Sequence, residues 1–129
     1  MDNDDLRPRT KAYALRVIRL VESLPRNRTA DVIGKQLLRS ATSVGANYRA
    51  ACRAKSPADF TAKVGIVEEE ADESLYWMEL LIESGLVTQD QLAGLITEGH
   101  QLVAMTVASI KTARIRMRNV ECGMRNKRS

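Results

Sequence analysis

The stretch QLLRSATSVGANYRAACRA, residues 36–54, carries the pattern that decides the fold. At the 100° per residue of an α-helix, its apolar and basic side chains fall on opposite faces. The apolar face, which begins with Ile33, contains Leu37, Ala41, Val44, Tyr48 and Ala51. The basic face contains Lys35, Arg39, Arg49 and Arg53. The pattern predicts an amphipathic helix that packs against other helices.

Local signals place a first helix before this central one. Thr10 is a suitable N-cap for the first helix, and Pro25 ends it. Asn27 or Thr29 then caps the central helix. The link between the two is short, so the central helix is expected to run antiparallel to the first.

Two further helices follow the central one. Ser56 as cap, Pro57 at the first helical position and an acid two residues later mark the start of the third helix, and Gly85 marks its end. A T-x-x-Q capping box at Thr88 opens a fourth helix of about thirty residues. Because no segment competes as a strand, the fold class predicted is all-α, an antiparallel up-and-down four-helix bundle. The bundle is expected to occupy residues 10–121, with flexible termini at 1–9 and 122–129.

The charges of this 129-residue chain, +4 in total, are arranged in blocks. Residues 6–55 contain twelve Lys/Arg and two acids, residues 60–98 contain one Lys and nine acids, and residues 99–129 are basic again. Blocks of opposite sign attract one another in a folded bundle, whereas an unmatched basic surface attracts nucleic acid. The sequence leaves both interpretations open.

Other features bear on location and chemistry. Cys52 and Cys122 have no metal or redox spacing, and unpaired thiols are typical of a reducing cytoplasm. The N-terminus MDNDDL is not a secretory leader, and no apolar stretch is long enough for a membrane span. His100 is the only histidine, so the E-x-x-H motifs of a di-iron bundle are absent. We therefore expect a soluble cytoplasmic protein that is not an enzyme and has no cofactor or metal.

Three motifs in order resemble a known bacterial family. QLLRSATSVGANYRAA resembles the family pattern QLRRAAVSIPSNIAEG, with Gly45 in place of the proline. The segment from Ser56 to Phe60 matches a capped S-x-x-E/D-F start, and EADESLYW matches E-x-x-E-x-x-x-W. Over residues 11–115 the chain resembles the four-helix-bundle proteins encoded by intervening sequences in large-subunit ribosomal RNA genes.

The resemblance implies a left-handed bundle that commonly assembles into a ring-shaped homopentamer. It also implies a relationship to the accessory protein of diversity-generating retroelements, a basic bundle that associates with a reverse transcriptase and nucleic acid. The family has no established enzymatic activity, so no catalytic residues carry over.

Basic residues on two helices are the candidates for contacting phosphate. They are Arg39, Arg49, Arg53 and Lys55 on or after the second helix, and Lys111, Arg114 and Arg118 on the fourth. Few aromatic side chains suit base stacking, so binding by charge is expected. The alternative is that some of these residues neutralise the acidic third helix.

A second stripe on the third helix is the candidate for self-association. It consists of Ile66, Glu70, Glu73, Trp77 and Leu80. The two glutamates are expected to pair with arginine, within the bundle or across a subunit boundary. Two functions remain open: an oligomeric bundle that binds RNA or DNA by charge, as accessory to a reverse transcriptase or other nucleic-acid enzyme, or a structural protein-interaction module.

Overall fold

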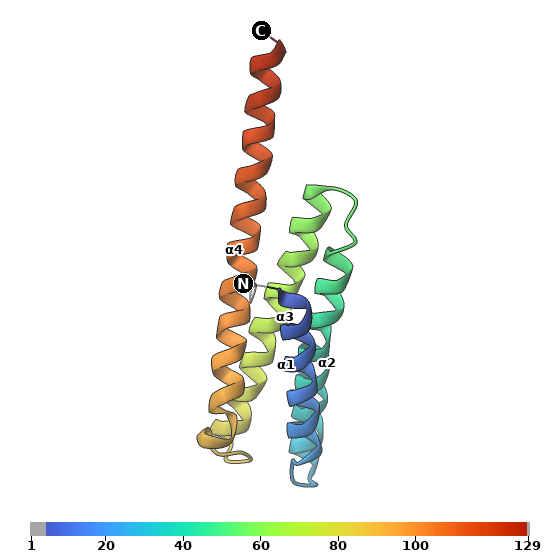
Figure 1. Ribbon diagram of the computed structural model, residues 1–129. Helices are drawn as coiled ribbons and strands as arrows, with labels where there is room; N and C mark the ends of the chain where they lie inside the picture. Colours follow the sequence, from blue (N-terminus) through green and yellow to red (C-terminus); the bar gives the residue numbers. More distant parts are fainter. Residues whose placement is uncertain (1–4, 129) are drawn as a thin grey trace.

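The computed structural model describes residues 5–128, and the side chains of all of these except 122 and 124–128. Four helices make up the chain: α1 (Leu6–Glu22), α2 (Arg28–Ala51), α3 (Pro57–Glu83) and α4 (Gln89–Arg128) (Figure 1). No residue within 5–128 is in a strand. The expectation of an all-α chain of four helices is therefore confirmed.

The helices pack in chain order and alternate in direction (Figure 1). α2 lies between α1 and α3, α3 lies between α2 and α4, and α4 also touches α1. Where α1 contacts α4, the Arg9 guanidinium donates to the Glu98 carboxylate at 2.7 Å and to the Gln101 side-chain oxygen at 2.7 Å. The far half of α4 continues past the end of the other helices (Figure 1).

Most of the predicted helix starts are confirmed by side-chain caps. The Asn27 side chain accepts the Ala30 N–H at 2.8 Å, and Ser56 accepts the Asp59 N–H at 3.1 Å with Pro57 next to it. Gln91 accepts the Thr88 N–H at 2.9 Å, as a capping box requires. Gly85, with φ of +80°, follows the end of α3 in the left-handed conformation that glycine adopts most easily.

The start predicted for α1 is wrong. The helix begins at Leu6 because Asp5 accepts the Arg7 N–H at 3.0 Å and acts as the cap. Pro8 fits in the first turn, where a backbone N–H has no partner within the helix to lose. Thr10, expected as the cap, is instead buried, and its hydroxyl donates to the Arg7 carbonyl.

Both ends of the helical region extend beyond the expected range 10–121. Residues 6–9 are helical where a flexible terminus was expected, and residues 1–4 lie outside the described part. α4 has 40 residues and reaches Arg128, so residues 122–128 are also helical rather than a flexible tail. Residue 129 lies outside the described part.

The core contains one buried polar pair among its aliphatic side chains. Tyr13 and Ser74 are both inaccessible to solvent, and their hydroxyl oxygens lie 2.8 Å apart. Burial raises the pKa of Tyr13 to about 12, because the phenolate would lose its hydration. Gly99 leaves the room for this pair, since a Cβ there would lie 2.9 Å from the Tyr13 hydroxyl and 2.7 Å from Leu75 Cδ2.

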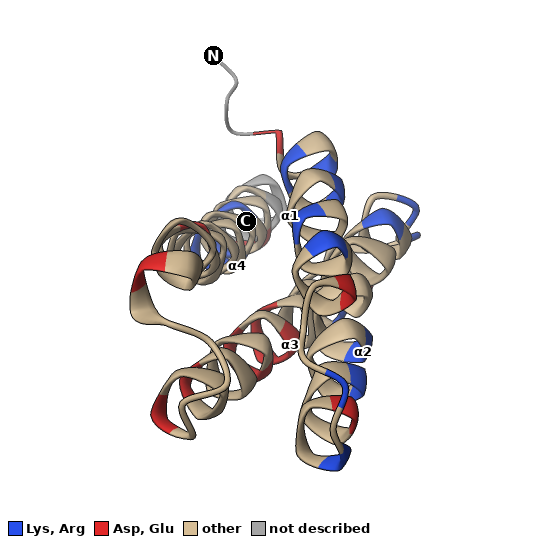
Figure 2. Cartoon of the chain, turned by 90° about the horizontal axis from the view of Figure 1, so that it is seen from below, with Lys and Arg blue, Asp and Glu red and all other residues tan. Residues whose placement is uncertain are grey.

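Charge divides the bundle into two sides. α1 and α2 together carry nine Lys or Arg and two acids, whereas α3 carries eight acids and one Lys. Figure 2 shows these charges in a view along the helices. The block pattern of the sequence thus becomes a basic pair of helices beside an acidic one.

Candidate nucleic-acid interface

The predicted phosphate-binding residues gather, with one exception, at one end of the molecule. Arg49 lies in the last turn of α2, and Arg53 and Lys55 lie in the link to α3. The distal half of α4 rises from the same end (Figure 1) and carries the other three, Lys111, Arg114 and Arg118. All six side chains are exposed. We call these six residues the basic end.

Arg49 lies between two hollows in the surface of the basic end. One hollow, of about 410 Å³, is also lined by Arg53, Lys55 and Lys63. The other, of about 450 Å³, lies between α1 and α2 and is also lined by Arg7 and Lys11. Cations from α1, from α3 and from the link between α2 and α3 therefore line the hollows on either side of a single arginine.

Acidic partners in this region are few. Lys63 contacts Asp59 at 2.5 Å, and Arg7 contacts Asp5 at 3.0 Å. Among the described residues, Arg49 and Arg53 have no ion pair. Their positive charge is therefore available to a ligand.

Arg39 is the exception. It lies in the middle of α2, where its guanidinium contacts Glu70 at 3.3 Å and also forms an ion pair with Glu73. Hydrogen bonds to these carboxylates raise the pKa of Arg39, with Glu73 contributing most. The structure thus separates Arg39 from the basic end and joins it to the acidic helix.

The predicted pairing of Glu70 and Glu73 with arginine is confirmed, and it occurs within one chain. Glu73 also accepts the Trp77 indole N–H at 3.0 Å. This hydrogen bond, with a smaller contribution from Arg39, holds the pKa of Glu73 below its ordinary value. The two glutamates therefore contribute to the contact between α2 and α3.

The other predicted interface residues differ in exposure. Trp77 is half-buried and packs against the core of its own chain, and Leu80 is also half-buried. Ile66 is exposed on the outer side of α3. Sequence reasoning missed Tyr76, which is 52% exposed and stacks edge-on against Trp77 at 5.1 Å. The large apolar side chains of α3 that are exposed to a partner are therefore Ile66 and Tyr76.

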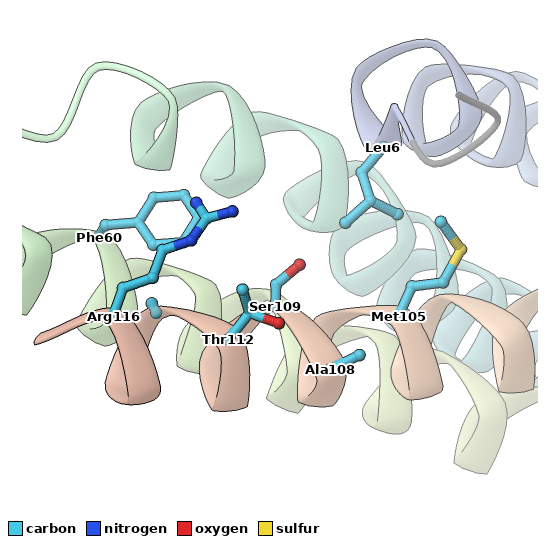
Figure 3. Close-up of a pocket in the computed structure, with 8 residues that line it drawn as sticks. Leu6, Phe60, Met105, Ala108, Ser109, Thr112 and Arg116 are labelled. Carbon is cyan, nitrogen blue, oxygen red and sulfur yellow. The ribbon is translucent and has the colours of Figure 1, made fainter. Parts of the chain in front are cut away.

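Two further residues at this end were not among the predicted site residues. Phe60 and Arg116 line a hollow of about 400 Å³ between the first turns of α1 and α3 and the side of α4 (Figure 3). Phe60 is half-buried and packs against Ala51, Val64 and Ile110. The sequence shows that Phe60 is the only phenylalanine, but not that α4 would pass beside it.

Other expectations concern metals, thiols and membranes. Among residues whose side chains are described, no three His, Cys, Asp or Glu gather as metal ligands would. Cys52 is exposed and is the C-cap residue of α2. No helix in the described range is both long and apolar enough to cross a bilayer.

Comparison with known proteins supports the family resemblance. The model of the 23S rRNA-intervening sequence protein family matches residues 5–108. A crystal structure from Bacteroides thetaiotaomicron, described as a protein with unknown function from the S23 ribosomal protein family, superposes with a TM-score of 0.78 at 35% identity. The match covers 82% of this chain and 98% of that chain. The comparison with curated proteins finds no match. The chain therefore belongs to the 23S rRNA-intervening sequence protein family.

Proposed function

We propose that this protein is a non-enzymatic, self-associating bundle that binds RNA or DNA through its basic end. One observation carries the proposal: every predicted phosphate-binding residue except Arg39 lies at that end, while Arg39 is neutralised by Glu70 and Glu73. A basic surface that existed only to balance α3 would lie against α3. The basic end instead faces solvent.

Binding of this kind depends on the number of phosphates contacted. Each neutralised phosphate contributes about 0.9 to the slope of log affinity against log salt on duplex DNA, and about 0.7 on single strands. Such binding is strong at low salt and nearly indifferent to sequence. It suits an accessory protein that holds nucleic acid for a larger enzyme in the cytoplasm, such as a reverse transcriptase.

Self-association would increase the effect by repeating the basic end. The exposed Ile66 and Tyr76 on α3 would meet a different surface of the neighbouring copy, which is a heterologous contact. Contacts of this heterologous kind close into rings when the rotation between copies allows it. The homopentamer suggested by the family resemblance is such a ring, and several linked sites bind more tightly than one.

The test compares two double charge reversals that change the net charge equally. Arg49→Glu with Arg53→Glu alters the basic end, and Arg19→Glu with Arg28→Glu alters exposed residues near the α1–α2 connection, at the opposite end. Fluorescence anisotropy with a labelled 20-base-pair duplex at 50 and 200 mM salt measures affinity. We expect the first reversal to abolish binding at 50 mM salt and the control to retain most of it.

Two results would contradict the proposal. One is a wild-type protein that does not bind at 50 mM salt, and the other is an equal loss of affinity in both reversals. A wild-type protein that self-associates without binding would support the alternative, a structural or protein-interaction module. The exposed Ile66 and Tyr76 on α3 are the observation that favours this alternative.

A further inference from the structure

The hollow beside Phe60 belongs to a longer groove on α4. A second hollow, of about 540 Å³, lies farther along α4 and is lined by Pro57, Met117 and Val120. Phe60, Ala113 and Arg116 line both hollows. The groove therefore runs along α4 on both sides of the Phe60 ring, and we call it the Phe60 groove.

Its lining combines two chemical characters. Phe60 and Met105 supply apolar and polarisable surface, and Figure 3 shows the Phe60 ring and the Arg116 side chain over the same hollow. Ser109 and Thr112 add hydroxyls to the wall, and neither has a hydrogen-bond partner among the described residues. Aromatic rings and guanidinium planes stack on unpaired nucleobases, and free hydroxyls bond to base edges.

Much of the groove lies outside the part of the chain that matches its family. The family match ends at residue 108, and the solved relative is covered over 98% of its length while 82% of this chain is covered. Ser109, Thr112 and Arg116 all come after residue 108. The opposite flank of α4 here carries Lys111, Arg114 and Arg118, so the groove lies in a strongly basic surrounding.

We propose that the Phe60 groove takes the unpaired bases of a single-stranded nucleic acid, with one base stacked on Phe60 and Arg116. This inference rests on the proposed function, and it adds a preference for single strands that charge alone does not give. A duplex keeps its bases stacked inside, so it can contact the phosphate-binding residues but cannot fill the groove. A second copy that placed its own α4 in the groove would bring the same excess of positive charge, so a strand that carries phosphates suits the groove better.

The experiment measures the affinity of the full chain for labelled dT20 and for a 20-base-pair duplex at the same salt. We expect Phe60→Leu to weaken dT20 binding about tenfold, since stacking on one aromatic ring has roughly that effect, and to leave duplex binding unchanged. Phe60→Tyr keeps a ring and should keep wild-type affinity. Val32→Ala removes exposed apolar surface from α2, away from both the groove and α3, and is the control, with no expected effect.

A second pair of variants keeps the charge and changes the shape. Arg116→Lys loses the planar guanidinium in the groove, and Arg118→Lys makes the same change on the opposite flank of α4. We expect only Arg116→Lys to lower the preference for dT20 over the duplex. Equal effects of the two substitutions would overturn the stacking role.

The remaining outcomes separate this inference from the proposed function. If the wild type binds neither probe, both fail. If it binds both probes and Phe60→Leu behaves as wild type, the groove does not take bases, and binding by charge stands. If Phe60→Leu lowers the molar mass in light scattering, the groove is a contact between copies, and the inference is overturned.

Discussion

The hydroxyl of Tyr13 lies 2.8 Å from the hydroxyl of Ser74, in a part of the core from which water is excluded. This contact joins α1 to α3 across the bundle. Ser74 also bonds to the Ala71 carbonyl at 2.6 Å, so the phenol is held by a hydroxyl that is itself fixed. Without this contact the Tyr13 hydroxyl would be a buried polar group without a bond, which is costly.

Ionisation of Tyr13 should make the protein lose stability at alkaline pH. Its pKa is raised from 10.0 to about 12, so its contribution is fully present below pH 10 and is lost as the pH rises toward 12. A two-unit difference corresponds to roughly 2–3 kcal/mol at most. Urea unfolding at pH 8 and pH 11 should show a smaller loss in Tyr13→Phe than in wild type, at a cost of about 1 kcal/mol at pH 8.

Tyr76→Phe is the control for this pH comparison, because it removes an exposed hydroxyl. Tyr48, whose pKa burial also raises to about 12, should leave part of the alkaline loss in place. An alkaline loss in Tyr13→Phe as large as in wild type would contradict the assignment to Tyr13.

Two glycine-to-alanine substitutions should change stability in opposite directions. Gly65 lies on α3 with nothing within 4 Å of the position that an added methyl group would take, so Gly65→Ala should stabilise by up to about 1 kcal/mol through helix propensity. At Gly99 the same methyl meets the Tyr13 hydroxyl and Leu75 at under 3.0 Å, so Gly99→Ala should destabilise by about 1–3 kcal/mol. Thermal unfolding by circular dichroism measures both, and a stabilising Gly99→Ala would show that the core there can expand.

The fluorescence of Trp77 should report the titration of Glu73. Trp77 is the only tryptophan, and its indole N–H donates to the Glu73 carboxylate at 3.0 Å. Because the pKa of Glu73 is lowered from 4.5, the stabilisation from this bond is present above that pH and is lost as the pH falls through the lower value. Emission should therefore change below pH 4.5 in wild type, and Glu73→Gln should remove that transition. A transition that persists in Glu73→Gln would mean that Trp77 senses another group.

Self-association should depend on the exposed face of α3 rather than on Trp77. Ile66→Ser exchanges an exposed apolar side chain for a polar one and should lower the molar mass in light scattering without loss of helix signal. Val32→Ser, a similar change at a residue of α2 that is 57% exposed, is the control and should leave the mass unchanged. Trp77→Ala is less informative, because the side chain also packs in its own core. A wild type that is monomeric at micromolar concentration would contradict self-association.

Local signals predicted most of the fold because they act over a few residues. The caps at Ser56 and Thr88 need only their own turn, and the apolar stripe of residues 36–54 needs only helical periodicity. The start of α1 was missed because residues 1–9 are mostly polar and give no apolar stripe, although Asp5 can cap a helix and proline is tolerated in a first turn. The length of α4 was underestimated because its apolar pattern weakens after Met117.

The candidate site was less predictable because it depends on contacts between distant residues. Sequence reasoning expected Glu70 and Glu73 to pair with an arginine, but it could not select Arg39, which is 31 residues from Glu70. The Tyr13–Ser74 bond spans 61 residues and has no local signal. Phe60 and Arg116 become neighbours only because α4 extends past α1 and beside the first turn of α3.

The extension of α4 past the other helices affects which part of the chain unfolds locally. Beyond Thr106, α4 has support from the start of α3 and little from α1, so it gains less from tertiary packing than the segment around Leu102 (Figure 1). Backbone amide hydrogens of residues 111–121 should exchange with deuterium faster than those near Leu102, through a local opening that leaves the four-helix region closed. One uninterrupted helix then contains two cooperative units. If the Phe60 groove binds bases as proposed, a change in the length or sequence of the second unit would alter which nucleic acids the protein holds without altering whether the first unit folds.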